Sequence, residues 1–419
     1  MFRRFGTMVV CAVAIGACAD GSAPTAVSPS ASMEAVSGFP IFAHYVAMGT
    51  SISEGNAAAG VLAASQQQSW VSQLSRLAGH PMKLPLISGT GCAAPFAVPL
   101  ITFTRISGEP VATPSDLLNC APLNEGIVTP EQNVAITGAT TLDALLMTPQ
   151  TKPGVFDKKL YSRVLPPNTT QLGAMRMQNP RIVSVELGAN EVLPAFSGVA
   201  IPGVTLVPFA VWAPLYHALV DSVAMVTRKG LLVGLTQNVA NFPGMRRGDE
   251  IWRNRAALLT AFNVAVSSDC NSSVNLVFVP ARVVGAVAIG LFNRQNGLPP
   301  VPFLCSDGGF GVVDYVLTPT EVFIVNALLA QMNAEIASTA VQHGFAHFQL
   351  EALYGLPNLK GPYSAVEQML SKHPYGGLIS ADGVHPSAAG QSVLANAAAA
   401  ALNATYQLGI PAPQFIAAR

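Results

Sequence analysis

Residues 45–55 read Tyr45-Val46-Ala47-Met48-Gly49-Thr50-Ser51-Ile52-Ser53-Glu54-Gly55, an apolar run that ends in a glycine and two hydroxyl side chains. The run at 45–48 predicts a buried strand, and the residues after it predict a tight turn into a helix. A serine at such a turn exposes its hydroxyl, and the backbone N–H of the helix start points the same way. A Gly-Thr-Ser turn alone is more often a helix cap than a catalytic turn, so its meaning depends on the rest of the chain.

The rest of the chain alternates between strand-like and helix-like segments. Further strands are expected at 133–136, 182–187, 231–235 and 346–350. Helices are expected at 69–77, 140–147, 213–228, 318–343 and 387–402. Buried strands that alternate with amphipathic helices predict a parallel sheet, here of five strands, with helices on both faces. Ligands of such sheets gather at the carboxyl ends of the strands, which is where the Ser51 turn lies.

Two long insertions interrupt this alternation, at about 84–131 and 241–316, and each contains two cysteines. The second insertion contains a predicted helix at 251–268, an apolar run at 283–292 and a Gly-rich turn at 307–311. The apolar run has three interpretations, a lid, a lipid-contacting patch or ordinary core, and core is the most common. Loops of this length inside a compact domain are usually functional or locally structured.

Four cysteines would remain in the mature fold, namely Cys92, Cys120, Cys270 and Cys305. An even number in an exported protein suggests two disulfides, for which three pairings are possible. Proximity along the chain favours Cys92–Cys120 and Cys270–Cys305. Zinc binding is the alternative, but no CxxC or HxxxH spacing supports it.

Residues 1–17 have the organisation of a secretory signal peptide, with two arginines, an apolar run at 8–15 and then small residues. The segment Ile15-Gly16-Ala17-Cys18 resembles the lipobox of bacterial lipoproteins, in which the cysteine carries the lipid. Ala19, rather than aspartate, follows Cys18, which resembles lipoproteins sorted to the outer membrane of Gram-negative bacteria. The alternative is an ordinary signal peptide cleaved near Ala17 or Ala19.

These features divide the chain into four expected parts. Residues 1–17 would be the signal peptide, 18–40 the lipid anchor and flexible tether, 41–407 the folded domain with both insertions, and 408–419 a C-terminal tail. A tether of about 20 residues reaches on the order of 25 Å, so the domain would stand off the membrane surface. We expect a monomer, exported to the periplasm or outer membrane and attached to the membrane by its N-terminal lipid.

Composition excludes several classes of protein. Only 11% of the 419 residues are charged, and 22 basic side chains balance 22 acidic ones. Disordered chains combine low hydrophobicity with high net charge, whereas half of this chain is hydrophobic and its formal net charge is zero. Its longest basic cluster is Arg246-Arg247, which excludes the basic surface of a nucleic-acid-binding protein. In the body of the chain, no apolar run reaches the roughly 18 residues of a membrane span.

Polar residues lie at the ends of several predicted strands and before the last helix. Ser51, Gly138 and Asn190 each occupy a turn directly after a strand. The segment Asp382-Gly383-Val384-His385-Pro386 precedes the last helix. An aspartate three residues before a histidine can accept its Nδ1–H and leave Nε2 free as a base. Taken singly, each of these sites could be an ordinary turn or helix cap.

Together and in this order, the four sites resemble the four sequence blocks of the SGNH (GDSL-type) hydrolase family, over residues 42–405 apart from the insertions. The resemblance implies a flavodoxin-like three-layer α/β/α fold and ester hydrolysis by a serine mechanism. It implies that Ser51 is the nucleophile, that His385 is the general base and that Asp382 orients His385. It also implies an oxyanion hole formed by the backbone N–H groups of Ser51 and Gly138 and the side-chain amide of Asn190.

The sequence departs from the family pattern at two positions. Thr50 stands where the family has the aspartate of Gly-Asp-Ser-Leu, and Glu191 stands where it has the aspartate of Gly-x-Asn-Asp. Neither change removes a group that carries the chemistry, but both concern the geometry of the turns. They are also the best support for an alternative function, a non-catalytic surface lipoprotein with the same fold that binds a glycan or a lipid.

We therefore expect an exported serine esterase or lipase that hydrolyses the acyl or acetyl esters of small molecules, lipids or glycans. Ser53 lies on the same turn as Ser51 but not at the family's position, and His373 has no aspartate three residues before it. No phosphate loop, haem motif or metal-ligand spacing implies a metal or another cofactor.

Overall fold

The computed structural model describes residues 39–111 and 120–411. The predicted signal peptide (1–17), the candidate lipidation site Cys18, and most of the tether and tail lie outside these residues. The described residues fall within one unit, Ser37–Arg419, which holds the central sheet and both insertions.

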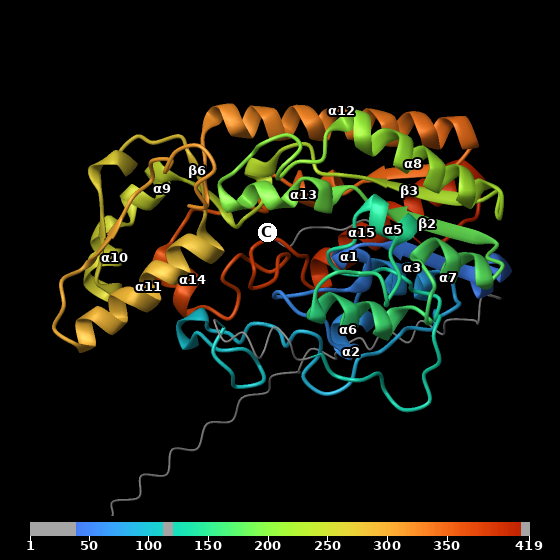
Figure 1. The fold of residues 1–419 in the computed structure, drawn as a ribbon, viewed down its shortest axis with the longest axis horizontal. Helices are drawn as coiled ribbons and strands as arrows, with labels where there is room; N and C mark the ends of the chain where they lie inside the picture. The colour runs from blue at the N-terminus through green and yellow to red at the C-terminus, as the bar shows by residue number, and fades with distance from the viewer. Residues whose placement is uncertain (1–38, 112–119, 412–419) are drawn as a thin grey trace, which may run out of the picture. The chain divides into compact units, whose positions relative to one another are not determined.

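A parallel sheet of four strands, in the order β1-β2-β3-β9, forms the centre of this unit (Figure 1). The strands β1, β2 and β3 are buried along their whole length, as their apolar sequences predict. The register pairs Gly49 with Glu186, so these two residues lie side by side at the carboxyl edge of the sheet. The strands are β1 (Tyr45–Gly49), β2 (Ile182–Glu186), β3 (Gly230–Gly234) and β9 (Ala346–Gln349).

The segment 133–136, predicted as a fifth strand, lies beside β1 without forming a regular strand. It pairs in parallel through a single bridge, between Asn133 and Ala47. The Asn133 side chain accepts a hydrogen bond from the N–H of Ala135 at 3.1 Å and donates one to the carbonyl of Ser53 at 2.8 Å. Local side-chain bonds of this kind compete with a strand ladder, which explains the irregular path.

Helices cover both faces of the sheet, so the predicted three-layer α/β/α architecture is confirmed. On one face α3 (Trp70–Leu77) packs against α15 (Ala388–Tyr406), which contacts β3 and β9. On the other face α8 (Phe209–Ala224) packs against α12 (Pro319–His343), which contacts the same two strands (Figure 1). The shorter helices of the domain are η1 (Pro40–His44), α1 (Ser51–Glu54), α2 (Ala63–Gln67), α5 (Thr141–Leu146), α6 (Val155–Val164), α7 (Gln171–Met177), η3 (Ala189–Glu191), η4 (Leu193–Ser197), α13 (Glu351–Tyr354) and α14 (Ala365–Leu370).

The second insertion forms a small α/β layer of its own. Its strands are β4 (Met245–Arg247), β6 (Leu276–Phe278) and β8 (Val316–Leu317), which form an antiparallel sheet, and the parallel pair β5 (Val264–Val266) and β7 (Val301–Phe303). Its helices are η5 (Val239–Asn241), α9 (Gly248–Arg253), α10 (Arg255–Phe262), η6 (Ser268–Cys270) and α11 (Val279–Gln295).

The single helix predicted at 251–268 is wrong, because two asparagines interrupt it. Asn254 separates α9 from α10, and its side chain donates to the carbonyl of Glu250 at 3.0 Å. Asn263 ends α10 in the left-handed conformation, with φ of 58°, and β5 begins at the next residue. Asparagine tolerates this conformation better than most residues, so it ends helices readily.

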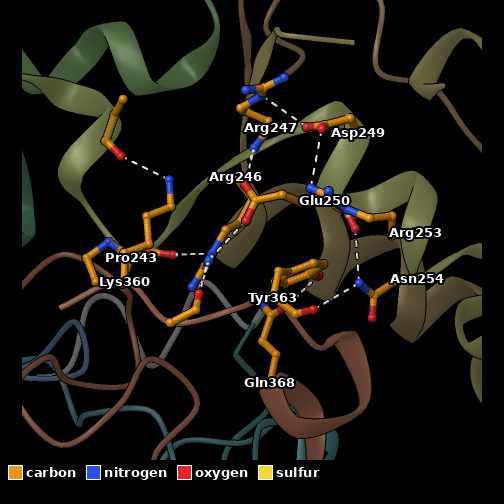
Figure 2. A network of polar contacts seen from close by, with 12 residues as sticks. Pro243, Arg246, Arg247, Asp249, Glu250, Arg253, Asn254, Lys360, Tyr363 and Gln368 are labelled. Carbon is orange, nitrogen blue, oxygen red and sulfur yellow. Dashed lines mark hydrogen bonds and ion pairs between the residues drawn. The ribbon is translucent and has the colours of Figure 1, made fainter. Parts of the chain in front are cut away.

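A buried arginine anchors the second insertion to the rest of the domain (Figure 2). Arg246 donates from Nη1 to the carbonyl of Gly361 at 2.7 Å and to Oε1 of Glu250 at 3.2 Å. Lys360 donates from Nζ to the carbonyl of Ala240 at 2.9 Å. These contacts join β4 and η5 to the loop before α14, so they hold the insertion beside the chain that leads to Asp382.

Both favoured disulfide pairings are confirmed, since Cys92 is bonded to Cys120 and Cys270 to Cys305. The first insertion is mainly irregular, with one short helix, η2 (Leu100–Thr102). The apolar run at 283–292 lies within α11. Its Val283 and Val287 are fully buried, as the core interpretation expects, whereas its Ile289 and Phe292 are exposed.

None of the helices in the described ranges combines the length and the hydropathy that a membrane span requires.

Candidate active site

Ser51 lies at the carboxyl edge of the sheet, on the turn that joins β1 to α1. Thr50 is the N-cap residue of α1, and Ser51 is its first residue. The turn needs glycine at position 49, because a Cβ there would lie 2.7 Å from Oγ of Ser53 and 3.0 Å from the carboxylate of Glu186. Glycine therefore leaves room for the Ser53 hydroxyl and the Glu186 carboxylate beside the end of β1.

Ser51, His385 and Asp382 form a continuous chain of hydrogen bonds. Oγ of Ser51 lies 2.8 Å from Nε2 of His385, and Nδ1 of His385 lies 2.8 Å from Oδ2 of Asp382. Oδ1 of Asp382 accepts the backbone N–H groups of Val384 and His385 at 2.9 and 2.8 Å. The segment after Asp382 therefore folds around the carboxylate, which fixes the orientation of the imidazole.

The electrostatics of this chain favour a charged imidazole. Burial alone would raise the pKa of Asp382, but the charge of His385 and the hydrogen bonds to the carboxylate lower it to about 2. Burial alone would lower the pKa of His385, but the Asp382 charge and its hydrogen bond, followed by the charges of Glu186 and Glu54, raise it overall. Asp382 is therefore an anion throughout the physiological range and stabilises His385 when it takes up a proton.

Gly138 lies in the loop after 133–136, beside the serine turn. The loop is tied to that turn at three points, since Glu54 accepts the N–H of Thr137 at 2.6 Å, Asn56 donates to Oγ1 of Thr137 at 3.2 Å, and the N–H of Ile136 bonds the carbonyl of Gly49 at 3.1 Å. Gly138 has a φ of 79°, which favours glycine. Within residues 39–111 and 120–411, no acceptor binds the backbone N–H of Ser51 or of Gly138.

Asn190 and Glu191 join the turn after β2 to the Gly138 loop. The Asn190 amide donates to the carbonyl of Ala139 at 2.8 Å, which leaves its second N–H for another acceptor. Oε1 of Glu191 accepts the N–H of Thr141 at 2.7 Å. The longer carboxylate at position 191 therefore still makes a hydrogen bond that fixes the turn.

Two buried glutamates that the sequence reasoning missed also contact the serine turn. Glu186, the last residue of β2, accepts hydrogen bonds from Thr50 and Ser53. Glu54 belongs to α1, and burial raises its pKa to about 7, although the hydrogen bonds of Thr137 and the charge of His385 oppose that rise. The signal for Glu186 was a charged residue inside the predicted buried strand 182–187, because buried carboxylates are rare unless they are paired.

An apolar cavity of about 40 Å³ opens beside Ser51 and His385. Its apolar wall includes Leu193, Phe196, Leu235, Val239, Phe242 and Leu329. The rings of Phe196 and Phe242 meet edge to face, with centroids 5.3 Å apart. The cavity lies at the carboxyl edge of the sheet, where ligands of parallel sheets are expected.

The competing sequence candidates lie outside this arrangement. Ser53 is fully buried, and its Oγ donates to Glu186 and accepts the indole N–H of Trp70 at 3.1 Å. His373 is exposed on the loop before Asp382. In the described part of the chain, no group of three or more His, Cys, Asp or Glu side chains is placed to hold a metal ion.

Several solved structures are similar to this chain. An acetylxylan esterase from Geobacillus stearothermophilus has 12% identity and a TM-score of 0.34, and the match covers 88% of this chain and 96% of that chain. An α/β hydrolase enzyme from the metagenome of Lake Arreo has 12% identity and a TM-score of 0.33, with 86% and 95% covered. An extracellular lipase from Streptomyces rimosus has 15% identity and a TM-score of 0.30, with 86% and 98% covered.

No curated protein matches the chain. The family model for GDSL-like lipases and acylhydrolases, in contrast, matches residues 45–398, a range that contains Ser51, Gly138, Asn190, Asp382 and His385. The chain therefore belongs to the GDSL-like lipase/acylhydrolase family and is a carboxylic ester hydrolase.

Proposed function

We propose that this protein is an exported serine esterase in which Ser51, His385 and Asp382 form the catalytic triad. The observation that carries the proposal is the unbroken chain from Oδ2 of Asp382 through both ring nitrogens of His385 to Oγ of Ser51, with 2.8 Å at each step. A serine hydroxyl is a weak nucleophile until an adjacent base takes its proton, and this geometry supplies that base.

The reaction would follow from these contacts in two steps. Oγ of Ser51 attacks the ester carbonyl while Nε2 of His385 takes the hydroxyl proton, and the tetrahedral intermediate collapses to an acyl-serine as His385 returns the proton to the leaving alcohol. Water then attacks the acyl-serine while Nε2 of His385 takes a proton from it. The second tetrahedral intermediate collapses as His385 returns the proton to Oγ of Ser51, which releases the carboxylic acid.

The oxyanion of each intermediate would be held by the N–H groups of Ser51 and Gly138 and by the free amide N–H of Asn190. The removal of one such donor typically costs about 10²–10³ in kcat. Asn190→Ala is therefore expected to lower kcat by that factor, with a smaller change in KM.

The acyl group would be short and apolar. A cavity of about 10–15 Å³ holds one water molecule, so a volume of about 40 Å³ has room for roughly three heavy atoms, which favours short acyl chains. Phe242→Ala should move the preferred chain length upward in a series of p-nitrophenyl esters. Phe323→Ala, at an exposed position on α12 that does not line the cavity, is the matched control and should leave the series unchanged.

Export rests on the predicted signal peptide (1–17) and on the predicted lipidation of Cys18. The two disulfides support it, because structural disulfides persist in oxidising compartments. Labelling with a radioactive fatty acid, compared between the native chain and Cys18→Ser, tests the lipid anchor. Equal labelling of both proteins would contradict it.

The decisive test of the triad is the hydrolysis of short p-nitrophenyl esters by the full chain and by Ser51→Ala. We expect a fluorophosphonate to label Ser51, and we expect the variant to lose both the label and the turnover. The alternative of a non-catalytic binder of glycan or lipid predicts no turnover by the native protein. Turnover that survives Ser51→Ala would exclude Ser51 as the nucleophile.

A further inference from the structure

The carboxylate of Glu186 is held by the turn that carries Ser51. It accepts the N–H of Thr50 at 3.0 Å and its Oγ1–H at 2.8 Å, and the N–H of Ser53 at 3.2 Å and its Oγ–H at 3.0 Å. The side chain is fully buried, and within the described residues no basic side chain pairs with it. Burial of a carboxylate costs desolvation free energy, and here the hydrogen bonds that offset this cost all come from one turn. This arrangement points to a role for Glu186 in that turn.

We infer that ionised Glu186 is a positioning residue for the proposed nucleophile, and that it supplies from β2 the carboxylate that Thr50 removes from the turn itself. The inference rests on the proposed role of Ser51. In this arrangement residue 50 donates with its hydroxyl, and Glu186 at the end of strand β2 accepts.

Three of the four groups that contact Glu186 favour an acceptor over a donor at this position. The two backbone N–H groups can only donate. The Oγ of Ser53 already accepts the indole N–H of Trp70, so its own hydrogen is directed to Glu186. Among these four groups, the Thr50 hydroxyl is the one that could accept a proton from a neutral Glu186, and the other three contacts favour the ionised form, although burial raises the pKa of Glu186.

The charge of Glu186 also acts on the general base. The acidic groups that face His385 are Asp382, Glu186 and Glu54, and each of them raises the pKa of its imidazole against the opposing effect of burial. Tyr354, whose hydroxyl donates to the carbonyl of Val384 at 2.7 Å, packs on the same segment. Glu186 therefore stabilises the imidazolium that forms when Ser51 attacks.

Glu186→Gln in the full chain tests the inference, because it keeps the shape and removes the charge. We expect kcat to fall by about ten- to hundredfold with little change in KM, since a small misplacement of the nucleophile costs up to about 10² in rate. The acid limb of the pH profile of kcat/KM should move to lower pH. The imidazole titration of His385, followed by NMR, should move in the same direction whether or not the ester is turned over.

A second variant separates positioning from simple loss of packing. Adding Thr50→Asp to Glu186→Gln returns a carboxylate to the turn, where it can cap the N–H of Ser53, and should restore most of the lost kcat. The matched control is Tyr45→Phe, which removes the 2.7 Å hydrogen bond to Ser184 between the same two strands. It should lower the melting temperature and leave kcat and the acid limb as in the native enzyme.

The outcomes distinguish this inference from the proposed function. A native protein that hydrolyses no ester overturns the proposed function. An active enzyme whose Glu186→Gln variant keeps kcat, the acid limb and the His385 titration overturns the role of Glu186 alone. A loss of kcat that Thr50→Asp does not relieve overturns it as well.

Discussion

Single residues at the carboxyl edge of the sheet decide what this enzyme can do. Thr50 and Glu191 depart from the family pattern, yet each lies in a hydrogen bond that orders its turn, Thr50 with Glu186 and Glu191 with Thr141. Each of these side chains therefore ties its turn to a neighbouring segment of the chain. With these contacts known, Thr50 and Glu191 support the alternative of a non-catalytic protein less than they do in the sequence alone.

The protonation of His385 sets the first prediction at this scale. In the proposed triad only a neutral imidazole can accept the Ser51 proton, and the surrounding carboxylates raise the pKa of His385 above its ordinary value of about 6.5. We expect kcat/KM to fall as the pH drops through the pKa of His385, with the midpoint of this acid limb above about 6.5. Asp382→Asn should move this limb to lower pH and reduce kcat by about 10⁴. An acid limb with its midpoint below about 6.5 in the native enzyme would contradict the assignment of His385 as the general base.

Glu54 gives a stability prediction of definite sign. Burial raises its pKa to about 7, from 4.5 in the unfolded chain. The native state therefore holds a proton that the unfolded chain releases, and the free energy of unfolding falls as the pH rises from about 4.5 to 7. Glu54→Gln should remove this loss. Above about pH 7, the free energy of unfolding of the variant should exceed that of the native protein by roughly 3 kcal/mol.

Urea unfolding of both proteins across this pH range measures the effect. Glu367→Gln, at an exposed position of α14, is the control and should leave the pH dependence unchanged. A constant difference between Glu54→Gln and the native protein at every pH would show that the side chain does not titrate in this range.

At the scale of elements, the second insertion depends on its contacts with the loop before α14. Arg246 on β4 makes these contacts while almost fully buried, and Asn254 adds a hydrogen bond to the carbonyl of Tyr363 at 3.0 Å (Figure 2). The same insertion packs against the turn of the proposed triad, because a Cβ on Gly383 would lie 2.8 Å from Cα of Gly244. Loosening the insertion should therefore disturb the segment that carries His385.

Arg246→Ala should destabilise the protein by about 3–5 kcal/mol, since it leaves the Glu250 carboxylate unpaired in a mostly buried position. Differential scanning calorimetry measures the change. The control is Arg253→Ala, which removes an exposed ion pair to Asp249 and should cost no more than about 0.5 kcal/mol. Equal losses in the two variants would mean that Arg246 does not anchor the insertion.

For the whole molecule, the two disulfides set how far the irregular insertions can open. Each bond closes its own insertion, Cys92–Cys120 over a separation of 28 residues and Cys270–Cys305 over 35. Neither bond crosses between the insertion and the sheet. The fold therefore gains a local constraint on each loop and leaves the central layers to hydrophobic packing.

The paired substitution Cys270→Ser/Cys305→Ser should lower the free energy of unfolding by about 3–4 kcal/mol, as expected for a loop of this length. The denaturant midpoint under non-reducing conditions measures it. The companion experiment is the native protein unfolded with reductant present. Its denaturant midpoint should fall at least as far as that of the double variant, because the reductant breaks both disulfides. Unchanged midpoints in both would show that the bond adds nothing to stability.

The α/β alternation, the four strands of the central sheet, the long helices that cover it, and the four polar turns follow from the sequence alone. They depend on local properties, namely apolar periodicity, turn residues and short spacings such as Asp382 to His385, which the chain displays without folding. The breaks at Asn254 and Asn263 were missed because asparagine occurs both within helices and at their ends, and only packing decides between the two.

Contacts between distant parts of the chain were decided by the tertiary structure alone. Glu186 lies more than a hundred residues from Thr50, and only the pairing of β1 with β2 brings its carboxylate under the serine turn. The apolar cavity is likewise assembled from η4, the loop after β3 and α12. The sequence names the groups that are proposed to carry the chemistry, but the partners that position them and shift their pKa values depend on strand order and register, which local residue patterns do not encode.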